Sequence, residues 1–190
     1  MSLRHGTRLV LVGLVALCAV AAVGGAGAAT TRTDRLLAPL SACPGSDSTT
    51  ASVTAQVASM SCLVSFARTQ AGLPKLRELK TLDKAASLKI AGDVRCAAFT
   101  HTPCGQPFQQ VFSAAGYPMG GGYTIGENLA WGQNDLGSPY QIMQAWLGSP
   151  DHRANLLSPS FKSMGLGVRT GMSFQGSDGV ALWANEFAGP

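Results

Sequence analysis

Apolar residues recur at helical spacing in the first half of this chain. A stripe from Val53 to Ala67 has its apolar residues three or four positions apart, which places them on one face of a helix. Gly72 and then Pro74 predict where this helix ends. A second stripe, from Leu82 to Val94, predicts another helix, and Thr81 is a residue that can cap it.

Two shorter helices follow in the middle of the chain. The first is predicted over Pro107–Ala115, because proline suits the first position of a helix and Gly116 suits its exit. The second is predicted over Pro139–Leu147, with Ser138 as its cap and Gly148 at its end.

The pattern changes in the last quarter of the chain. Residues Met164–Val168 alternate large side chains with glycine, which is typical of a strand against which another backbone packs closely. Residues Val180–Phe187 predict a second strand, and residues 176–179 have the composition of a turn between the two. Helices first and strands last favour an α+β domain with a mostly antiparallel sheet.

The N-terminus has the features of an export signal. A basic start precedes an uncharged apolar run over residues 9–23, and residues 26–28 form a small-residue cleavage pattern. We therefore expect residues 1–29 to be a secretory signal peptide, because the apolar run is short for a membrane span. An uncleaved membrane anchor is the alternative. We expect a flexible lead-in over residues 30–52 and one domain over residues 53–190.

Charge excludes one class of partner. The formal net charge of +4 includes two arginines of the predicted signal peptide, so the remaining chain would carry +2. A nucleic-acid binder would have a denser basic stripe. The richest basic stretch, Arg68–Arg95, also contains acidic residues, and solvated helix faces explain it. We expect no nucleic-acid partner and no membrane span after signal cleavage.

The cysteine count predicts two disulfides. One of the five cysteines lies in the predicted signal peptide, which leaves an even number in an exported chain. Three pairings are available to four cysteines. We expect Cys43–Cys62, which would fasten the lead-in to the first helix, and Cys96–Cys104, which would close a short loop around His101.

Candidate chemistry lies in three separate segments, which we interpret as loops. His101 follows the second predicted helix, Glu127 lies in the segment Gly-Glu-Asn-Leu-Ala-Trp, and His152 lies in Ser-Pro-Asp-His-Arg-Ala-Asn-Leu-Leu. Scattered histidines and a carboxylate that meet only on folding are what a metal or acid–base site needs.

These three segments resemble the CAP superfamily of cysteine-rich secretory, antigen 5 and pathogenesis-related 1 proteins, in its bacterial branch with the SCP domain. The resemblance implies an α–β–α sandwich. It also implies a central cavity with two histidines and two acidic residues, which His101, His152 and Glu127 match in part. The position of the second acid, five residues before Trp146, is Gln141 here, which keeps hydrogen-bonding capacity but loses the charge. We also expect Asn128 at this cavity.

Three interpretations of this cluster stay open. His101 and His152 can hold zinc or another divalent metal, with Glu127 as a third ligand, as a partner that orients a histidine, or as a base. The same residues can form a structural polar cluster. They can also be catalytic residues of a hydrolase. A serine nucleophile is disfavoured because no Gly-x-Ser-x-Gly elbow occurs.

The missing second acid favours binding over catalysis. We therefore predict a secreted, extracellular binding module with a divalent-metal site, whose ligand is a lipid, an envelope polymer or a protein. The alternative is a weak metal-assisted hydrolase, similar to a peptidase, that uses His101, His152 and Glu127. The resemblance implies apolar grooves for lipids in some family members, although the aromatic residues of this chain are most simply core.

Overall fold

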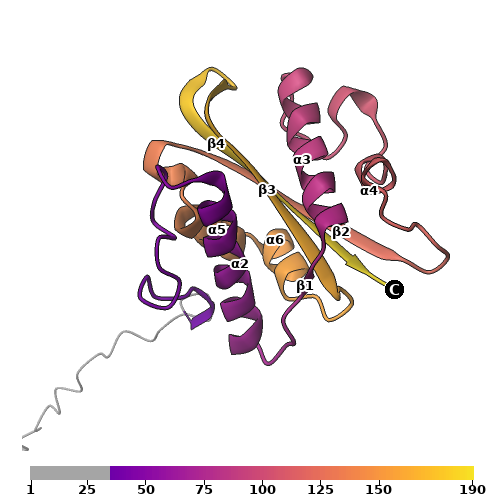
Figure 1. Cartoon of the computed structure of the whole chain (residues 1–190), viewed down its shortest axis with the longest axis horizontal. Coiled ribbons are helices and arrows are strands. Elements are labelled where there is room, and N and C mark those ends of the chain that lie inside the picture. Colours follow the sequence, from indigo (N-terminus) through magenta and orange to yellow (C-terminus); the bar gives the residue numbers. More distant parts are fainter. Residues whose placement is uncertain (1–34) are drawn as a thin grey trace, which may run out of the picture.

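Helices and strands form three layers in the computed structural model, which describes residues 35–190 (Figure 1). A sheet in the middle is covered by helices on both faces, which confirms the predicted α+β class and its α–β–α sandwich. The predicted signal peptide lies outside the described residues. No helix among residues 35–190 has the length and hydropathy that a membrane crossing requires.

The sheet has four strands in the order β1-β3-β4-β2. They are β1 (Arg77–Glu78), β2 (Thr124–Gln133), β3 (Ser163–Phe174) and β4 (Ser177–Gly189). Strand β4 pairs antiparallel with both β2 and β3, and only the short β1 pairs in parallel, with β3. The sheet is therefore mostly antiparallel, as predicted, and β2 is one of its edges.

The helices divide between the two faces. One face is covered by α2 (Val53–Gln70), α5 (Pro139–Gly148) and α6 (Pro150–Leu156). The other is covered by α3 (Lys80–Arg95) and α4 (Gln110–Ala115) (Figure 1). Two short 3₁₀ helices, over 103–105 and 134–137, lie in the connections.

Alternation along β4 gives each face its own core. Trp183 and Phe187 pack with α2 and α5, whereas Leu182 and Ala184 point to α3 on the other side. All four are fully buried. Consecutive residues of a strand point to opposite faces. A strand that is covered on both sides therefore needs apolar residues at nearly every position.

The glycines of β3 allow α3 to lie close to the sheet. A Cβ on Gly165 would overlap the backbone of Leu82, and one on Gly167 would crowd Ala86. The alternation of large residues and glycine was therefore read correctly, and the backbone that packs against this strand is that of a helix.

The predicted helices all form, with corrections at their starts. α2 and α5 match, and the Ser138 hydroxyl accepts a hydrogen bond from the amide of Gln141 as the cap of α5. The prediction of Thr81 as a cap was wrong, because α3 already begins at Lys80. The third predicted helix was also too long, since α4 begins at Gln110.

The hairpin between β3 and β4 turns earlier than predicted. Its loop is Gln175–Gly176, where both residues have positive φ, and residues 177–179 already belong to β4. Two residues with positive φ match the type I′ turn that joins antiparallel strands tightly. Strands β1 and β2 and helix α6 were not predicted from the sequence.

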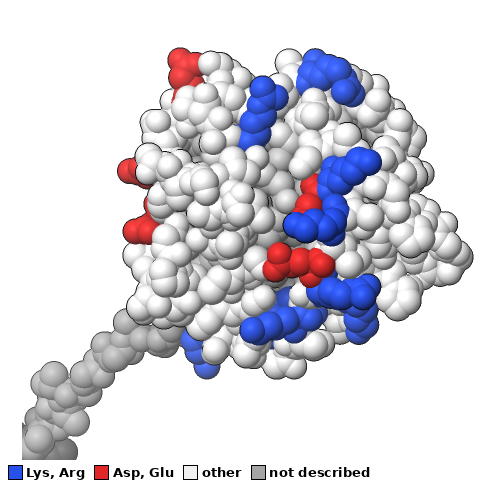
Figure 2. All heavy atoms as spheres, in the orientation of Figure 1, with Lys and Arg blue, Asp and Glu red and all other residues white. Residues whose placement is uncertain are grey.

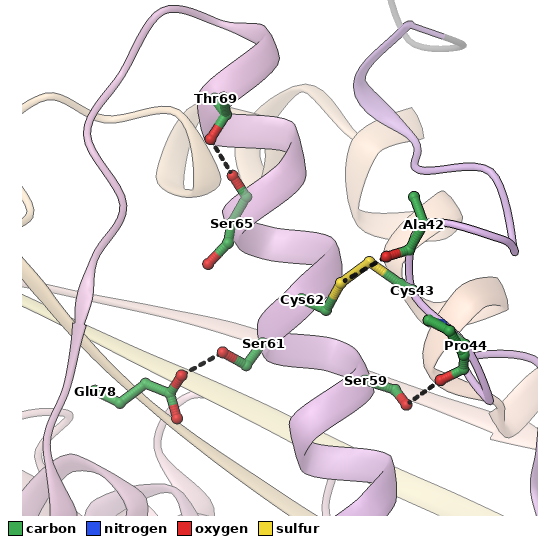
Figure 3. The surroundings of a disulfide bond; sticks show 9 residues. All are labelled: Ala42, Cys43, Pro44, Ser59, Ser61, Cys62, Ser65, Thr69 and Glu78. Atoms are coloured by element: carbon green, nitrogen blue, oxygen red, sulfur yellow. Dashed lines mark hydrogen bonds between the residues drawn. A yellow bond between two sulfur atoms is a disulfide. The ribbon is translucent and has the colours of Figure 1, made fainter.

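Both disulfides form in the predicted pairs, Cys43–Cys62 and Cys96–Cys104. The first joins α2 to the segment before it, with 5.7 Å between the two Cα atoms (Figure 3). The Ser59 hydroxyl of α2 also donates to the carbonyl of Pro44. Residues 35–52 are thus attached to the domain, and Leu36 and Ala38 are part of its core.

Candidate functional site

The three motif residues lie on three different kinds of element. His101 lies in the connection after α3, as predicted, but Glu127 lies on strand β2 and His152 on helix α6. The prediction of three loops was therefore wrong for two of the three residues. A strand and a helix hold their side chains more rigidly than loops do, so the site has a firm base on the edge of the sheet.

His101 and Glu127 are in direct contact. The distance from His101 Nδ1 to Glu127 Oε1 is 2.5 Å. The imidazole is 58% exposed, whereas the side chain of Glu127 is only 1% exposed. The ring of Phe108 stands edge-on to the imidazole, 6.4 Å away between centroids. The contact uses Nδ1, so His101 Nε2 is the ring nitrogen left for another partner.

The connection that carries His101 is fixed at two points. The disulfide Cys96–Cys104 encloses it, with 5.6 Å between the Cα atoms. Inside this loop, the ammonium group of Lys89 donates to the carbonyl oxygen of Thr100, the residue before His101. The loop therefore presents His101 from a covalently closed and internally bonded frame.

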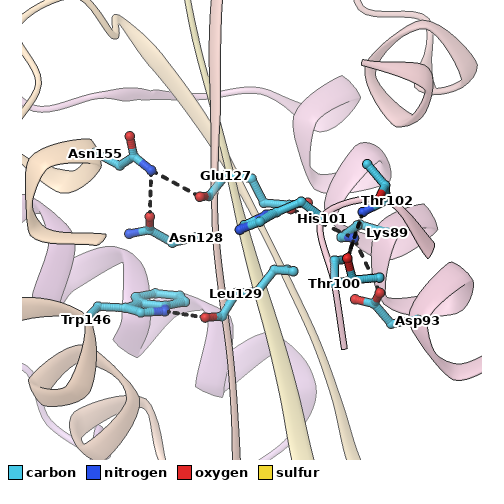
Figure 4. Close-up of polar contacts among 10 residues, drawn as sticks. All are labelled: Lys89, Asp93, Thr100, His101, Thr102, Glu127, Asn128, Leu129, Trp146 and Asn155. Carbon is cyan, nitrogen blue, oxygen red and sulfur yellow. Dashed lines mark hydrogen bonds and ion pairs between the residues drawn. The ribbon is translucent and has the colours of Figure 1, made fainter. Parts of the chain in front are cut away.

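A buried charged cluster lies beneath His101 (Figure 4). Lys89 on α3 is 3.3 Å from Asp93 Oδ1 and 3.9 Å from Glu127 Oε1. Glu186 on β4 is the partner of Glu127 across the two strands, and it is fully buried. One lysine thus stands among three carboxyl groups between α3 and the sheet.

Burial and mutual repulsion raise the proton affinity of two of these carboxyl groups. Loss of solvation, and then the negative charge of Glu127, raise the pKa of Glu186 well above its ordinary value. Loss of solvation also raises the pKa of Asp93, although Lys89 counteracts this. Asp93 Oδ2, Glu127 Oε2 and both oxygens of Glu186 have no hydrogen-bond partner among the described residues. The cluster is therefore sensitive to protonation.

The two histidines shift in opposite directions. The hydrogen bond to Glu127 raises the pKa of His101, although partial burial acts against it. Burial, and then the positive charge of His101, lower the pKa of His152. The two imidazoles are therefore near enough to influence each other, and neutral His152 is the better metal donor at neutral pH.

A network of amides on the other side of β2 fastens α6 to the strand. Asn128 donates from Nδ2 to the carbonyl of His152 at 2.9 Å, and its Oδ1 accepts from Asn155 Nδ2 at 3.0 Å. Asn155 also donates to the carbonyl of Glu127. Figure 4 shows these amides on one side of β2 and the charged cluster on the other. Asn128 is fully buried and positions the backbone of the His152 turn.

Gln141 lies in the first turn of α5, beside an open groove. The groove has a volume of about 380 Å³ and includes Trp131 and Leu136 in its lining. Among the described residues, no hydrogen bond or ion pair joins Gln141 to His101, Glu127 or His152. Its role at the cavity stays a prediction.

Sequence reasoning missed Lys89, Asp93 and Glu186. Lys89 and Asp93 are four residues apart on α3, so their side chains can form an ion pair. Both adjoin the apolar stripe of the helix, and charged side chains are rarely buried there unless they are paired. Glu186 follows Val180, Leu182 and Ala184 at the same alternating positions of β4. A carboxyl group on a face that is otherwise apolar was the available signal.

The residues fit a divalent metal in part. A histidine that is bonded to a carboxylate through one nitrogen commonly offers the other nitrogen to a metal. His101 is arranged in this way, and His152 is the second motif histidine. Among residues 35–190, however, no three His, Cys, Asp or Glu side chains are grouped closely enough to hold a metal ion. The protein therefore provides two imidazole ligands to a metal. Two ligands fit weak binding better than a structural zinc site, which usually has four protein ligands.

A family model matches most of the described chain. The model, described as CAP, the cysteine-rich secretory protein family, matches residues 63–183. A curated protein from Bacillus subtilis strain 168, the uncharacterized protein YkwD, is 33% identical over 131 residues. That match covers 67% of this chain and 44% of YkwD, so the chain spans less than half of this relative.

Solved structures resemble this chain in fold. An extracellular protein containing a SCP domain from Bacillus anthracis has a TM-score of 0.60 at 20% identity, over 72% of this chain and 41% of that one. An outer surface protein from Borrelia burgdorferi has a TM-score of 0.54 at 20% identity, over 68% of this chain and 89% of that one. At this identity the likeness concerns the fold alone.

Proposed function

Because the chain belongs to the cysteine-rich secretory protein (CAP) family, we propose that it is a binding module that acts outside the cell, with a weak divalent-metal site at His101 and His152. Its two disulfides suit an oxidising exterior. Two proteins of similar fold are described as extracellular and as an outer surface protein, which supports the same location.

One observation carries the metal proposal. Glu127 occupies Nδ1 of His101 and leaves Nε2, on a ring that is 58% exposed, available to a cation. His152 would be the second ligand, and zinc is the metal that two neutral imidazoles suit. A bound zinc would supply Lewis acidity and would link the α3 side of the site to α6. Glu127 would then orient His101 rather than bind the metal itself.

The burial of Glu127 argues against a strong hydrolase. A base must reach a water molecule or a substrate proton. The Glu127 carboxylate is 1% exposed, and one of its oxygens is engaged with His101 and lies 3.9 Å from Lys89. We therefore expect the metal-loaded protein to hydrolyse substrates slowly or not at all.

Zinc titration by calorimetry tests the metal site. We expect binding by the wild type, and loss of at least about tenfold in affinity in His101→Ala and in His152→Ala. Gln70→Ala, an exposed change near the end of α2, is the control and should bind as the wild type does. Unchanged affinity in the double histidine variant would reject the site.

A hydrolysis screen tests the alternative function. The zinc-loaded protein is incubated with casein, an ester and peptidoglycan, beside Glu127→Gln and His152→Ala. A robust rate that disappears in both variants would replace the binding module with a metal-assisted hydrolase. Activity that survives both changes would arise elsewhere.

The Gln141 position is tested by restoring an acid. If Gln141 faces the metal, Gln141→Glu should enlarge the rise in melting temperature that zinc produces, since ligand binding to the native state adds stability. Gln144→Glu is the control, because Gln144 lies on the same helix and borders the same groove. Equal shifts in the two variants would remove Gln141 from the site.

A further inference from the structure

Exposed basic residues gather on one face of the molecule. Residues 35–190 contain eight exposed lysines and arginines, and seven of them belong to β1, α3, β3 or the segments next to β1 and β3. Figure 2 shows blue side chains over the region of β1 and α3, with some red side chains among them and others at the left margin. We call the seven residues the basic band: Lys75, Arg77, Lys80, Lys84, Arg95, Lys162 and Arg169.

The band follows α3 and the edge of the sheet. Lys80, Lys84 and Arg95 lie along one side of the helix, and 15 residues of helix extend about 22 Å. Arg169 borders a groove of about 230 Å³ between α3 and β3. At the other end, the amide of Arg77 donates to the carbonyl of Lys162. The charges therefore form a line rather than a broad patch.

Two acidic residues, Asp83 and Glu78, lie within the band, and each accepts a hydrogen bond from a neighbouring group of the protein. Asp83 Oδ1 accepts the amide of Leu166 at 3.1 Å, and Oδ2 lies 3.9 Å from Lys80. Glu78 accepts a hydrogen bond from the hydroxyl of Ser61. Among the described residues, Lys80 is the only member of the band within ion-pair distance of a carboxylate.

The other exposed acids lie away from this face. They are Asp47, Asp135, Asp151 and Asp178, none of which belongs to β1, α3 or β3. The positive charges of the band lie on one face, so their fields add where neighbours are within about one Debye length, about 10 Å at moderate salt. The seven basic residues outnumber Glu78 and Asp83 on this face, so its net charge is positive.

We propose that the basic band is a binding surface for a linear anionic polymer that carries phosphate or carboxylate groups. A row of cations about 22 Å long can contact several successive groups of an extended chain. A membrane surface would be met by basic residues mixed with large apolar ones. Of the six exposed large apolar residues in the described part of the chain, only Leu88 lies on α3, and none lies on β1 or β3.

This surface is separate from the His101 site. It depends on none of His101, Glu127 or His152, so His101→Ala should bind the polymer normally even where zinc binding is lost. Failure of the metal proposal and failure of the polymer proposal are therefore distinguishable.

Binding to long-chain inorganic polyphosphate, and to polygalacturonate as the carboxylate probe, tests the band. The purified protein is compared with Lys84→Gln/Arg169→Gln at about 50 mM to about 200 mM salt. We expect the double variant to bind at least about fivefold more weakly and its slope of log K against log salt to fall by about 1.4, since each lost contact removes about 0.7. A preference for one probe identifies phosphate or carboxylate as the recognised group.

A matched control separates position from net charge. Gln109→Glu/Gln144→Glu changes the net charge by the same amount at exposed sites outside the band, and it should keep wild-type affinity within about twofold. Equal weakening in both variants would show a general charge effect and overturn the proposal. Absence of wild-type binding to both polymers would also overturn it, and so would binding to phosphatidylglycerol vesicles alone.

Discussion

Two buried cations lie on opposite faces of the sheet, and their surroundings differ. Arg68 near the end of α2 is fully buried, and within residues 35–190 it donates only to backbone carbonyls, those of Pro74, Leu156 and Ser158. Lys89 on α3 is 1% exposed and contacts Asp93, Glu127 and the carbonyl of Thr100. The first cation has neutral partners, and the second has charged ones.

The different partners of Arg68 and Lys89 indicate different roles for the two cations. Arg68 joins the ends of α2 and α6, where unpaired carbonyls favour a positive charge. Burial lowers the pKa of Arg68, and no carboxylate among the described residues lies within 4.0 Å of it. Lys89 instead holds carboxyl groups whose charge depends on pH. The contacts of Arg68 are therefore structural, whereas those of Lys89 connect α3 to Glu127 of the candidate site.

The largest expected effect is that of Lys89→Met. Loss of the ammonium leaves Asp93 and Glu127 buried without their cation, which should lower the free energy of unfolding by about 3–5 kcal/mol near pH 8. Burial raises the pKa of Asp93, so this group takes up a proton more readily than usual and the deficit should shrink as the pH falls towards about 5. Urea unfolding at several pH values measures both effects.

An exposed lysine on the same helix provides the control. Lys84→Met changes the same side chain in the same way at the surface, and it should alter stability by less than about 0.5 kcal/mol. Asp93→Asn added to Lys89→Met should recover part of the loss. A deficit of Lys89→Met that is the same at every pH would contradict the charged-cluster interpretation.

The second largest effect should come from Arg68→Met. It leaves three carbonyl groups without their donor, which should cost about 2–3 kcal/mol after the relief of burying a guanidinium is subtracted. The carbonyls do not titrate, so this cost should be the same near pH 5 and pH 8. Arg68→Lys keeps the charge but not the planar set of donors and should be intermediate. A pH-dependent cost would mean that an acidic group is coupled to Arg68.

The comparison also shows what the sequence could predict. Periodic apolar residues identified α2 and α3, start and stop residues identified α5, and the motifs identified His101, Glu127 and His152, because these signals are local. β2 was not predicted, because it is an edge strand with apolar and polar residues on both of its faces. Its segment was interpreted as a loop that carries Glu127. The contacts of Lys89 with Thr100 and Glu127 depend on tertiary packing, which no local spacing encodes.

A smaller effect of opposite sign is expected for Glu186→Gln. The pKa of Glu186 is raised in the folded state, so the native protein loses stability as the pH rises from the unfolded value through the folded one. The neutral amide avoids this loss. We expect the variant to be more stable than the wild type by about 1–2 kcal/mol near pH 8 and equal to it near pH 4. A variant that is less stable at pH 8 would show that the carboxylate is needed there.

The smallest effect should be that of His101→Gln, and its pH dependence should be opposite to that of His152→Gln. Glu127 raises the pKa of His101, so its contribution to stability is present below about pH 6.5 and is lost as the pH rises through the folded value. The imidazole is 58% exposed, so screening by solvent should keep the effect below about 1 kcal/mol.

Burial lowers the pKa of His152, so the native state with His152 becomes more stable as the pH rises. Urea unfolding near pH 5.5 and pH 8.5 should therefore give a greater cost for His101→Gln at the lower pH and for His152→Gln at the higher pH. The same pH trend in both variants would mean that the Glu127 contact does not control the protonation of His101.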